Sequence, residues 1–203
     1  METFCPERPL VVNPAFARQR EEALAALASF ALFHLVTVFP LSWMTLYGEA
    51  SPPQILWTQV AGALVACAAI VLSGWMADRF GRRNTLGAMA VLIGLFSFAT
   101  PMLLNGGTAG QNLFILIGFA LLGLSYGQSS GTVTANFSRK FRFVGAAYSA
   151  DLAWLLGAAL APLVALYLSS HFGPVAVGGY LLSGAVCTLA ALGINRALET
   201  SRK

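Results

Sequence analysis

Long apolar runs divided by short polar breaks constrain this chain more than any other feature. The runs lie near residues 23–47, 54–76, 85–104, 112–137, 144–169 and 174–198. Each contains about the 20 mostly apolar residues that a helix needs to cross the hydrocarbon core of a bilayer. The sequence therefore predicts an all-α membrane protein with six transmembrane helices and no long soluble domain between them.

The composition excludes the common alternatives. Hydrophobic residues make up 57% of the 203 residues and charged residues 10%, whereas soluble domains are about 45–50% apolar and about 25% charged. So few charges cannot solvate the surface of a soluble protein, and the apolar content also excludes disorder. The three cysteines, Cys5, Cys67 and Cys187, are odd in number and widely scattered, which argues against a disulfide scaffold and predicts free thiols.

The positions of lysine and arginine predict the orientation. All twelve lie before the first run, in the breaks after the second and fourth runs, or near the end of the sixth, and the other breaks carry none. Because cytoplasmic loops are enriched in basic residues, both termini are expected in the cytoplasm. The domain prediction is then a cytoplasmic N-terminal segment at 1–22, a six-helix transmembrane domain at 23–198 and a cytoplasmic tail at 199–203. Residues 1–22 are polar and proline-containing, unlike a signal peptide.

A glycine-rich basic motif follows the second run. It reads G-x-x-x-D-R-x-G-R-R and contains Gly74, Asp78, Arg79, Gly81, Arg82 and Arg83. We expect Gly81 to allow a tight turn and Gly74 a close backbone approach, while the arginines compensate the charge of Asp78. The alternative is a basic topogenic loop with an incidental aspartate. The motif resembles the signature of the major facilitator superfamily, where it joins the second and third helices of a six-helix half. That resemblance implies a cytoplasmic gating loop.

A second resemblance concerns the break after the fourth run. Residues 137–151 are similar to the F-P-x-x-x-R-Y-T-G-x-S-x-x-x-N stretch of metabolite:proton symporters, between the tenth and eleventh of twelve helices. Phe137, Arg142 and Gly145 match the pattern, whereas Asp151 stands where the pattern has asparagine. Ser138, Phe143, Val144 and Ala147 also depart from it. Residues 2–4 are similar to part of that family's central cytoplasmic loop.

The two resemblances together imply the carboxyl-terminal six-helix half of a transporter. Such proteins move small organic acids or zwitterions with protons, by alternating access between two halves. A second six-helix half, in a homodimer or on a separate chain, would then be required as a partner, together with the lipid bilayer of the inner membrane. The competing interpretation is a truncated or non-transporting membrane subunit. Nucleic acid is not an expected partner.

Asp151 is the strongest candidate for a functional residue inside a span. An ionisable group in a membrane helix is costly and is therefore a functional hypothesis. Tyr148, Asp151 and Trp154 follow one another at three-residue spacing, which predicts one polar and aromatic helix face. We expect this face to line the substrate or proton path. The alternative is a structural aspartate that pairs with Arg142 or caps its own helix.

Further candidates for the substrate or proton path are neutral. His34 lies midway along the first run near Thr37, and Tyr126 and Gln128 lie in the fourth run. A histidine can relay protons or bind substrate, but one satisfied within a helix interface would serve structure alone. Serine, glutamine and asparagine also join membrane helices without any ligand. Gln54 and Gln59 of the second run carry the same two alternatives.

Glycines of the fourth run predict a packing face. Gly123, Gly127 and Gly131 recur every four residues, as in close helix pairs in membranes. The same stretch reads G-x-S-x-G at Ser125 and Ser129, but a hydrolase nucleophile needs a strand-to-helix turn and an Asp-His pair. No nucleotide, zinc or redox motif occurs in the sequence. We therefore expect no enzyme, no cofactor and no metal.

Overall fold

The computed structural model describes residues 28–29, 31–47, 51–135, 147, 151, 154–155 and 161–200, without the side chains of 128–135 and 194–200. These residues are helical apart from single connecting positions. The principal helices are α2 (Phe39–Tyr47), α3 (Pro52–Phe80), α4 (Arg82–Asn105), α5 (Gly107–Ala135), α7 (Ala161–Phe172) and α8 (Pro174–Thr200). A further helical stretch at residues 31–37 precedes α2.

Four helices of the described part are long and apolar enough to cross a membrane. They are Pro52–Phe80, Arg82–Asn105, Gly107–Gly127 and Pro174–Gly193. At 1.5 Å per residue, the 29 residues of α3 extend about 43 Å, which exceeds the hydrocarbon core of about 30 Å. The first and fifth apolar runs are described in part, by residues 28–47 with gaps and by α7. The prediction of an all-α membrane protein is confirmed.

The connections between helices are shorter than the sequence suggested. Single glycines, Gly81, Gly106 and Gly173, separate α3 from α4, α4 from α5 and α7 from α8. The polar stretches predicted as loops are therefore mostly end turns of helices, and α5 begins at residue 107 rather than 112. Gly81 and Gly173 have φ angles of 85° and 76°. Glycine reaches this left-handed region without the steric cost that a Cβ imposes, so one residue suffices to reverse the chain.

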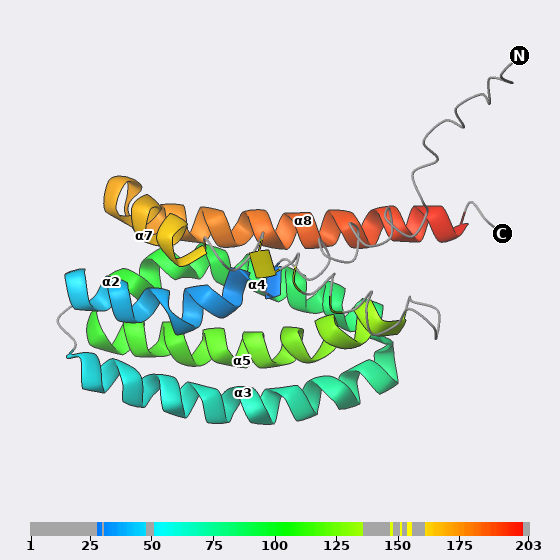
Figure 1. Cartoon of the computed structure of the whole chain (residues 1–203), viewed down its shortest axis with the longest axis horizontal. Coiled ribbons are helices and arrows are strands. Elements are labelled where there is room, and N and C mark those ends of the chain that lie inside the picture. Colours follow the sequence, from blue (N-terminus) through cyan, green and yellow to red (C-terminus); the bar gives the residue numbers. More distant parts are fainter. Residues whose placement is uncertain are drawn as a thin grey trace, which may run out of the picture.

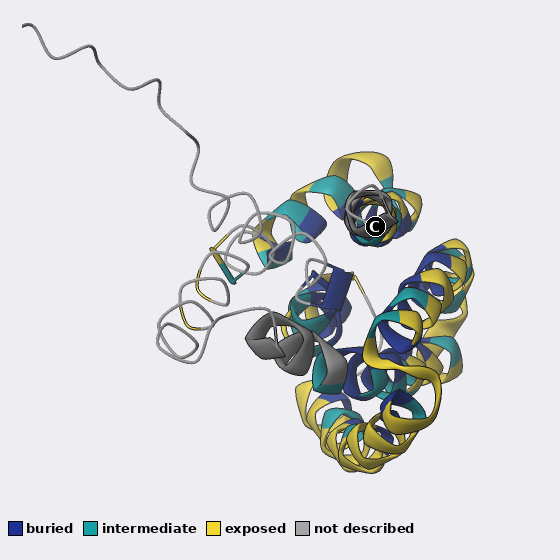
Figure 2. Ribbon diagram, turned by 90° about the vertical axis from the view of Figure 1, so that its right-hand side faces the viewer, coloured by how far each residue is buried: buried dark blue, intermediate teal, exposed yellow. Residues whose placement is uncertain are grey.

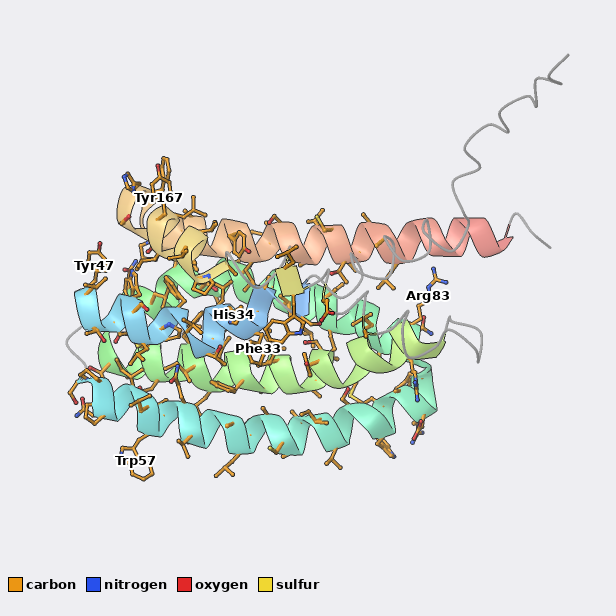
Figure 3. The ribbon with its side chains drawn as sticks, in the orientation of Figure 1. Phe33, His34, Tyr47, Trp57, Arg83 and Tyr167 are labelled. Atoms are coloured by element: carbon orange, nitrogen blue, oxygen red, sulfur yellow. The ribbon has the colours of Figure 1, made fainter. Side chains whose placement is uncertain are left out.

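The helices run side by side along one axis and alternate in direction (Figure 1). The α3–α4 connection and the C-terminal ends of α5 and α8 lie at one end of the bundle, and Arg83 marks that end (Figure 3). The C-terminal end of α2, marked by Tyr47, and the α7–α8 connection lie at the other end. This arrangement places the basic α3–α4 connection at the same end of the bundle as the C-terminal end of α8.

Apolar residues occupy both the interior and the outer surface of the bundle. Phe39 and Phe114 are almost completely buried between the helices, and the rings of Phe96 and Phe114 stack with centroids 5.4 Å apart. The outward sides carry exposed residues (Figure 2). On α3 these include Trp57 and Val71, which are 73% and 76% exposed. Such outward apolar faces suit contact with lipid rather than with water.

The closest helix pair, α3 and α5, meets through glycines. A Cβ placed on Gly123 would lie 2.8 Å from the Cβ of Ala69, and one placed on Gly127 would lie 3.5 Å from Ile70. The missing side chains therefore let the two helices approach closely. The predicted packing face is confirmed at Gly123 and Gly127, while the surroundings of Gly131 lie outside the described side chains.

Hydrogen bonds hold the two ends of the same helix pair. Near the α3–α4 connection the Ser73 hydroxyl donates to the Leu124 carbonyl oxygen at 2.6 Å. Toward the other end the Thr58 hydroxyl donates to Asn112 Oδ1 at 3.1 Å. Because water is scarce inside a bilayer, such bonds satisfy polar groups that would otherwise be costly there. They fix the register of α5 along α3.

Candidate functional site

The α3–α4 connection carries the predicted gating loop. Asp78, Arg79 and Arg82 are exposed at this end of the bundle. The Arg79 guanidinium carbon lies 5.6 Å from the ring centroid of Trp75 and 6.0 Å from that of Phe80, within the range of cation–π attraction. The aromatic rings of the last turns of α3 therefore orient Arg79, and the charged groups remain accessible to a partner.

The loop is also tied to neighbouring helices. An Arg83 guanidinium nitrogen donates to the Leu192 carbonyl oxygen of α8, and the Asn84 amide donates to the Phe80 carbonyl oxygen at 3.1 Å. The Gly81 N–H donates to the Ala77 carbonyl oxygen at 2.9 Å. The predicted tight turn at Gly81 is confirmed, because its positive φ is the geometry that glycine permits.

The expectation for Gly74 was wrong within the described residues. A Cβ placed on Gly74 would meet no atom within 4 Å, and the residue is exposed. The neighbouring helices of this chain do not use the space that the missing side chain leaves. The motif therefore places Gly74 on an outward face of α3 rather than at a close contact within the bundle.

The central finding is an aromatic cluster that includes three of the predicted site residues. Phe33 and His34 of the first span, Tyr126 of α5 and Trp154 lie together, and we refer to these four side chains as the aromatic cluster. The Trp154 ring lies 5.2 Å from that of Phe33 and 5.4 Å from that of His34, both edge-to-face. The Phe33 and Tyr126 rings are 6.3 Å apart. These distances lie in the range of favourable aromatic pairs.

The aromatic cluster lies near the middle of the bundle. In Figure 3, Phe33 and His34 lie between the end marked by Tyr47 and Tyr167 and the end marked by Arg83. Three separate segments contribute its side chains: the first span, α5 and the helical residues 154–155. Long apolar helices run past it in the direction of the bundle axis.

His34 contributes an unsatisfied polar atom to the aromatic cluster. Its ring is partly buried, and its Nδ1 is buried without a hydrogen-bond partner among the described residues. The Thr37 hydroxyl of the same helical stretch donates to the Phe33 carbonyl oxygen at 2.7 Å. Buried polar atoms are nearly always hydrogen-bonded in folded proteins. Among the described residues, the imidazole nitrogen is therefore a candidate for a further hydrogen bond.

The structure describes the remaining predicted site residues unequally. Asp151 is exposed and helical, three positions before Trp154. Tyr148 lies outside the described residues, as does the side chain of Gln128. His34, Tyr126 and Trp154 are thus brought together, whereas the contribution of Asp151, Tyr148 and Gln128 stays a prediction.

Sequence reasoning missed Phe33. It links His34, Tyr126 and Trp154, yet a phenylalanine within an apolar run has nothing to distinguish it from lipid-facing neighbours.

The G-x-S-x-G pattern lies inside a continuous helix, as expected, and not at a strand-to-helix turn. The Ser125 hydroxyl donates to the Leu122 carbonyl oxygen of that same helix at 3.3 Å. No group of three or more metal-ligating side chains occurs among the residues that the structure describes.

The long apolar helices and the mid-bundle site define a multi-pass membrane protein. The family model of the major facilitator superfamily matches residues 23–200, and the chain belongs to this family. The family resemblance drawn from the motif at 74–83 is thereby confirmed, while its role as a gating loop stays a prediction.

Several characterised or named proteins are similar to this chain. It is 34% identical to the inner membrane metabolite transport protein YhjE of Escherichia coli (strain K12), over 82% of this chain and 39% of that protein. It is 27% identical to the shikimate transporter of the same organism, over 82% of this chain and 38% of that protein. The cis,cis-muconate transport protein of Acinetobacter baylyi is 30% identical over 57% of this chain and 27% of its own length.

These similarities cover only part of the relatives. The chain spans about two fifths of the length of the E. coli proteins it matches. No solved structure matches the chain. The matching proteins are transport proteins rather than enzymes, and the first of them is an inner membrane protein. The predictions of a non-enzymatic, multi-pass protein of the inner membrane are confirmed.

Proposed function

We propose that this chain forms one half of a transporter that moves a small organic acid or zwitterion across the inner membrane. The observation that carries the proposal is the aromatic cluster, which brings an unsatisfied imidazole nitrogen to the middle of an apolar bundle. The chain has the composition and helix lengths of a spanning bundle, and the family moves solutes rather than transforming them. Its six spans would leave both termini in the cytoplasm.

The names of two relatives support an organic acid as the substrate. Shikimate and cis,cis-muconate are both small carboxylates with unsaturated carbon skeletons, and relatives of this chain are named for their transport. The aromatic rings of Phe33 and Trp154 suit contact with a carbon skeleton, and His34 Nδ1 suits a carboxyl oxygen. Tyr126, Tyr148 and Gln128 would add hydrogen bonds to the same ligand.

Transport would proceed by alternating access with a coupled proton. Asp151 is exposed in the half described here. It would carry the proton once a second half encloses it, because a carboxylate in a protected cavity can alternate between charged and neutral forms. Asp78, Arg79, Arg82 and Arg83 would form a cytoplasmic latch. A substrate path between two halves needs a second wall, so a second six-helix half would complete the site, in a homodimer or from a separate chain.

The test is uptake into vesicles that carry the chain. We would express it alone and together with the part of the E. coli relative that this chain does not match, and measure accumulation of labelled shikimate or cis,cis-muconate under an imposed pH gradient. We expect accumulation with the second part and none with verified monomers of the chain. Uptake by monomers would contradict the requirement for a second half.

The aromatic cluster provides a matched pair of variants for this assay. We expect Trp154→Ala to abolish uptake, because it removes the ring that contacts both Phe33 and His34. Trp57→Ala removes the same side chain from an exposed position on the outer face of α3 and should leave uptake close to wild type. Equal effects of the two substitutions would exclude the aromatic cluster from the path. Stable assemblies without any uptake would favour the alternative, a non-transporting membrane subunit.

The orientation is tested by cysteine labelling. In a background without native cysteines, Asn84→Cys and Thr108→Cys place thiols at exposed positions near the starts of α4 and α5, at opposite ends of the bundle. An impermeant maleimide applied to whole cells should label position 108, and position 84 only after the membrane is permeabilised, because the basic α3–α4 connection faces the cytoplasm. The reverse pattern would refute the proposed orientation.

A further inference from the structure

The first span is interrupted next to the aromatic cluster. Residues 31–37 are helical, Val38 is in a turn, and α2 begins at Phe39. Pro40 explains the interruption, since proline has no N–H to donate and its ring clashes with the carbonyl four residues earlier. That carbonyl belongs to Val36, which is fully buried. A buried carbonyl that loses its helical donor needs another one.

Gln59 of α3 supplies the missing donors. Its Nε2 donates to the Thr37 carbonyl oxygen at 2.6 Å and to the Val36 carbonyl oxygen at 3.4 Å. A side-chain amide has two N–H donors, so one side chain can serve both carbonyls that a proline kink releases. Breaks in membrane helices are tolerated where a neighbouring helix satisfies the freed backbone groups in this way.

The interruption is continuous with the aromatic cluster. Phe33 and His34 lie in the helical turn directly before it. The Thr37 hydroxyl donates to the Phe33 carbonyl oxygen at 2.7 Å, and the Val38 N–H donates to the His34 carbonyl oxygen at 3.0 Å. Thr37, whose carbonyl oxygen accepts from Gln59, thus bonds directly to Phe33, and its neighbour Val38 bonds directly to His34. Any shift at the break would move both rings against Trp154.

We propose that Gln59 is a positioning residue, which replaces the hydrogen bonds that Pro40 removes and thereby holds Phe33 and His34 in the aromatic cluster. The interpretation of the cluster as a substrate path rests on the proposed function, but the link between Gln59 and Pro40 does not. The sequence offered two roles for Gln59, lining the cavity or joining helices. Its bonds to the backbone of the first span agree with the second role.

A double-mutant cycle tests the link. Gln59→Met keeps the approximate shape and removes the donors, so it should lower the midpoint of thermal unfolding of the full chain in detergent by about 2–4 °C. In a Pro40→Ala background, the restored N–H can reach Val36, and the same substitution should cost less than half as much. If Gln59→Met alone does not fold, the double variant should restore folded protein.

Gln54 supplies a matched control on the same helix. Its Oε1 accepts the Ser51 N–H at 3.1 Å at the exposed start of α3, away from the interruption. The effects of Gln54→Met and Pro40→Ala should therefore add. If the effects of Gln59→Met and Pro40→Ala also add, the proposal is overturned.

The emission of Trp154 tests positioning as distinct from stability. With Trp43, Trp57 and Trp75 replaced by Phe, the remaining tryptophan reports on its contacts with Phe33 and His34. Well below the unfolding temperature, Gln59→Met should shift the emission maximum to longer wavelength, and adding Pro40→Ala should reverse the shift. An unchanged maximum would reduce Gln59 to a stabilising role and overturn positioning. If the emission shift occurs as expected but the assembled protein takes up no substrate, the result counts against the proposed function and leaves the positioning role of Gln59 in place.

Discussion

Replacing Gly123 by leucine is expected to destabilise the bundle strongly. A Cβ at this position would lie 2.8 Å from the Cβ of Ala69 and 2.9 Å from the Cα of Ala66, and would also press on the Ala66 carbonyl oxygen. Backbone atoms of α3 cannot move aside as a flexible side chain does. The two helices would have to separate, which would also break the neighbouring bond from Ser73 to Leu124.

The size of the effect follows from the marginal stability of proteins. Overpacking a well-packed core costs about 1–3 kcal/mol and occasionally more, and a leucine against backbone belongs at the upper end. We would measure the yield of monodisperse protein by size-exclusion chromatography and its unfolding midpoint. Gly123→Ala should give an intermediate result, because it adds the Cβ alone.

A control glycine lies on α8. A Cβ placed on Gly179 would meet no atom within 4 Å, and the residue is exposed. Gly179→Leu should therefore leave both the yield and the midpoint close to wild type. Equal losses of yield and midpoint at positions 123 and 179 would show that any large residue in place of glycine destabilises the bundle. The close α3–α5 contact would then not be the cause of the loss at position 123.

The predictable parts of the fold follow from the length and hydropathy of the apolar runs. Helices α3, α4, α5 and α8 correspond to apolar runs because length and hydropathy decide whether a segment can cross a bilayer. Most of these helices extend a few residues beyond the apolar runs, because polarity marks where a chain meets water, whereas a helix ends where its backbone turns. At Gly81 and Gly173 a single residue with positive φ makes that turn, so flanking polar residues remain helical.

The candidate site was predictable only where its residues contrast with their surroundings. His34, Tyr126 and Trp154 carry polar atoms in apolar runs, and that contrast singles them out. Phe33 shows no such contrast. The role of Gln59 was out of reach for a different reason: its partners are backbone carbonyls of another helix, and the cause of their need is a proline at a third position. Spacing along one helix cannot reveal such a set.

The second large effect is expected from Asp151→Asn, which should abolish proton-driven accumulation. An amide has the shape of a carboxylate but cannot take up and release a proton. If one proton accompanies each substrate, a gradient of one pH unit supports about a tenfold accumulation, because one unit is worth about 1.4 kcal/mol. In the assembly that shows uptake, the variant should lower the accumulation ratio to about one.

Substrate exchange separates coupling from binding in the same vesicles. Exchange of internal for external substrate needs no net proton movement, so Asp151→Asn should retain it while accumulation is lost. Asp78→Asn is the control: this aspartate is exposed near the C-terminal end of α3, and its loss should slow accumulation and exchange together without uncoupling them. If Asp151→Asn leaves accumulation unchanged, the carboxylate serves packing. The proton would then pass to His34, whose buried Nδ1 has no partner among the described residues and whose ring already contacts Trp154.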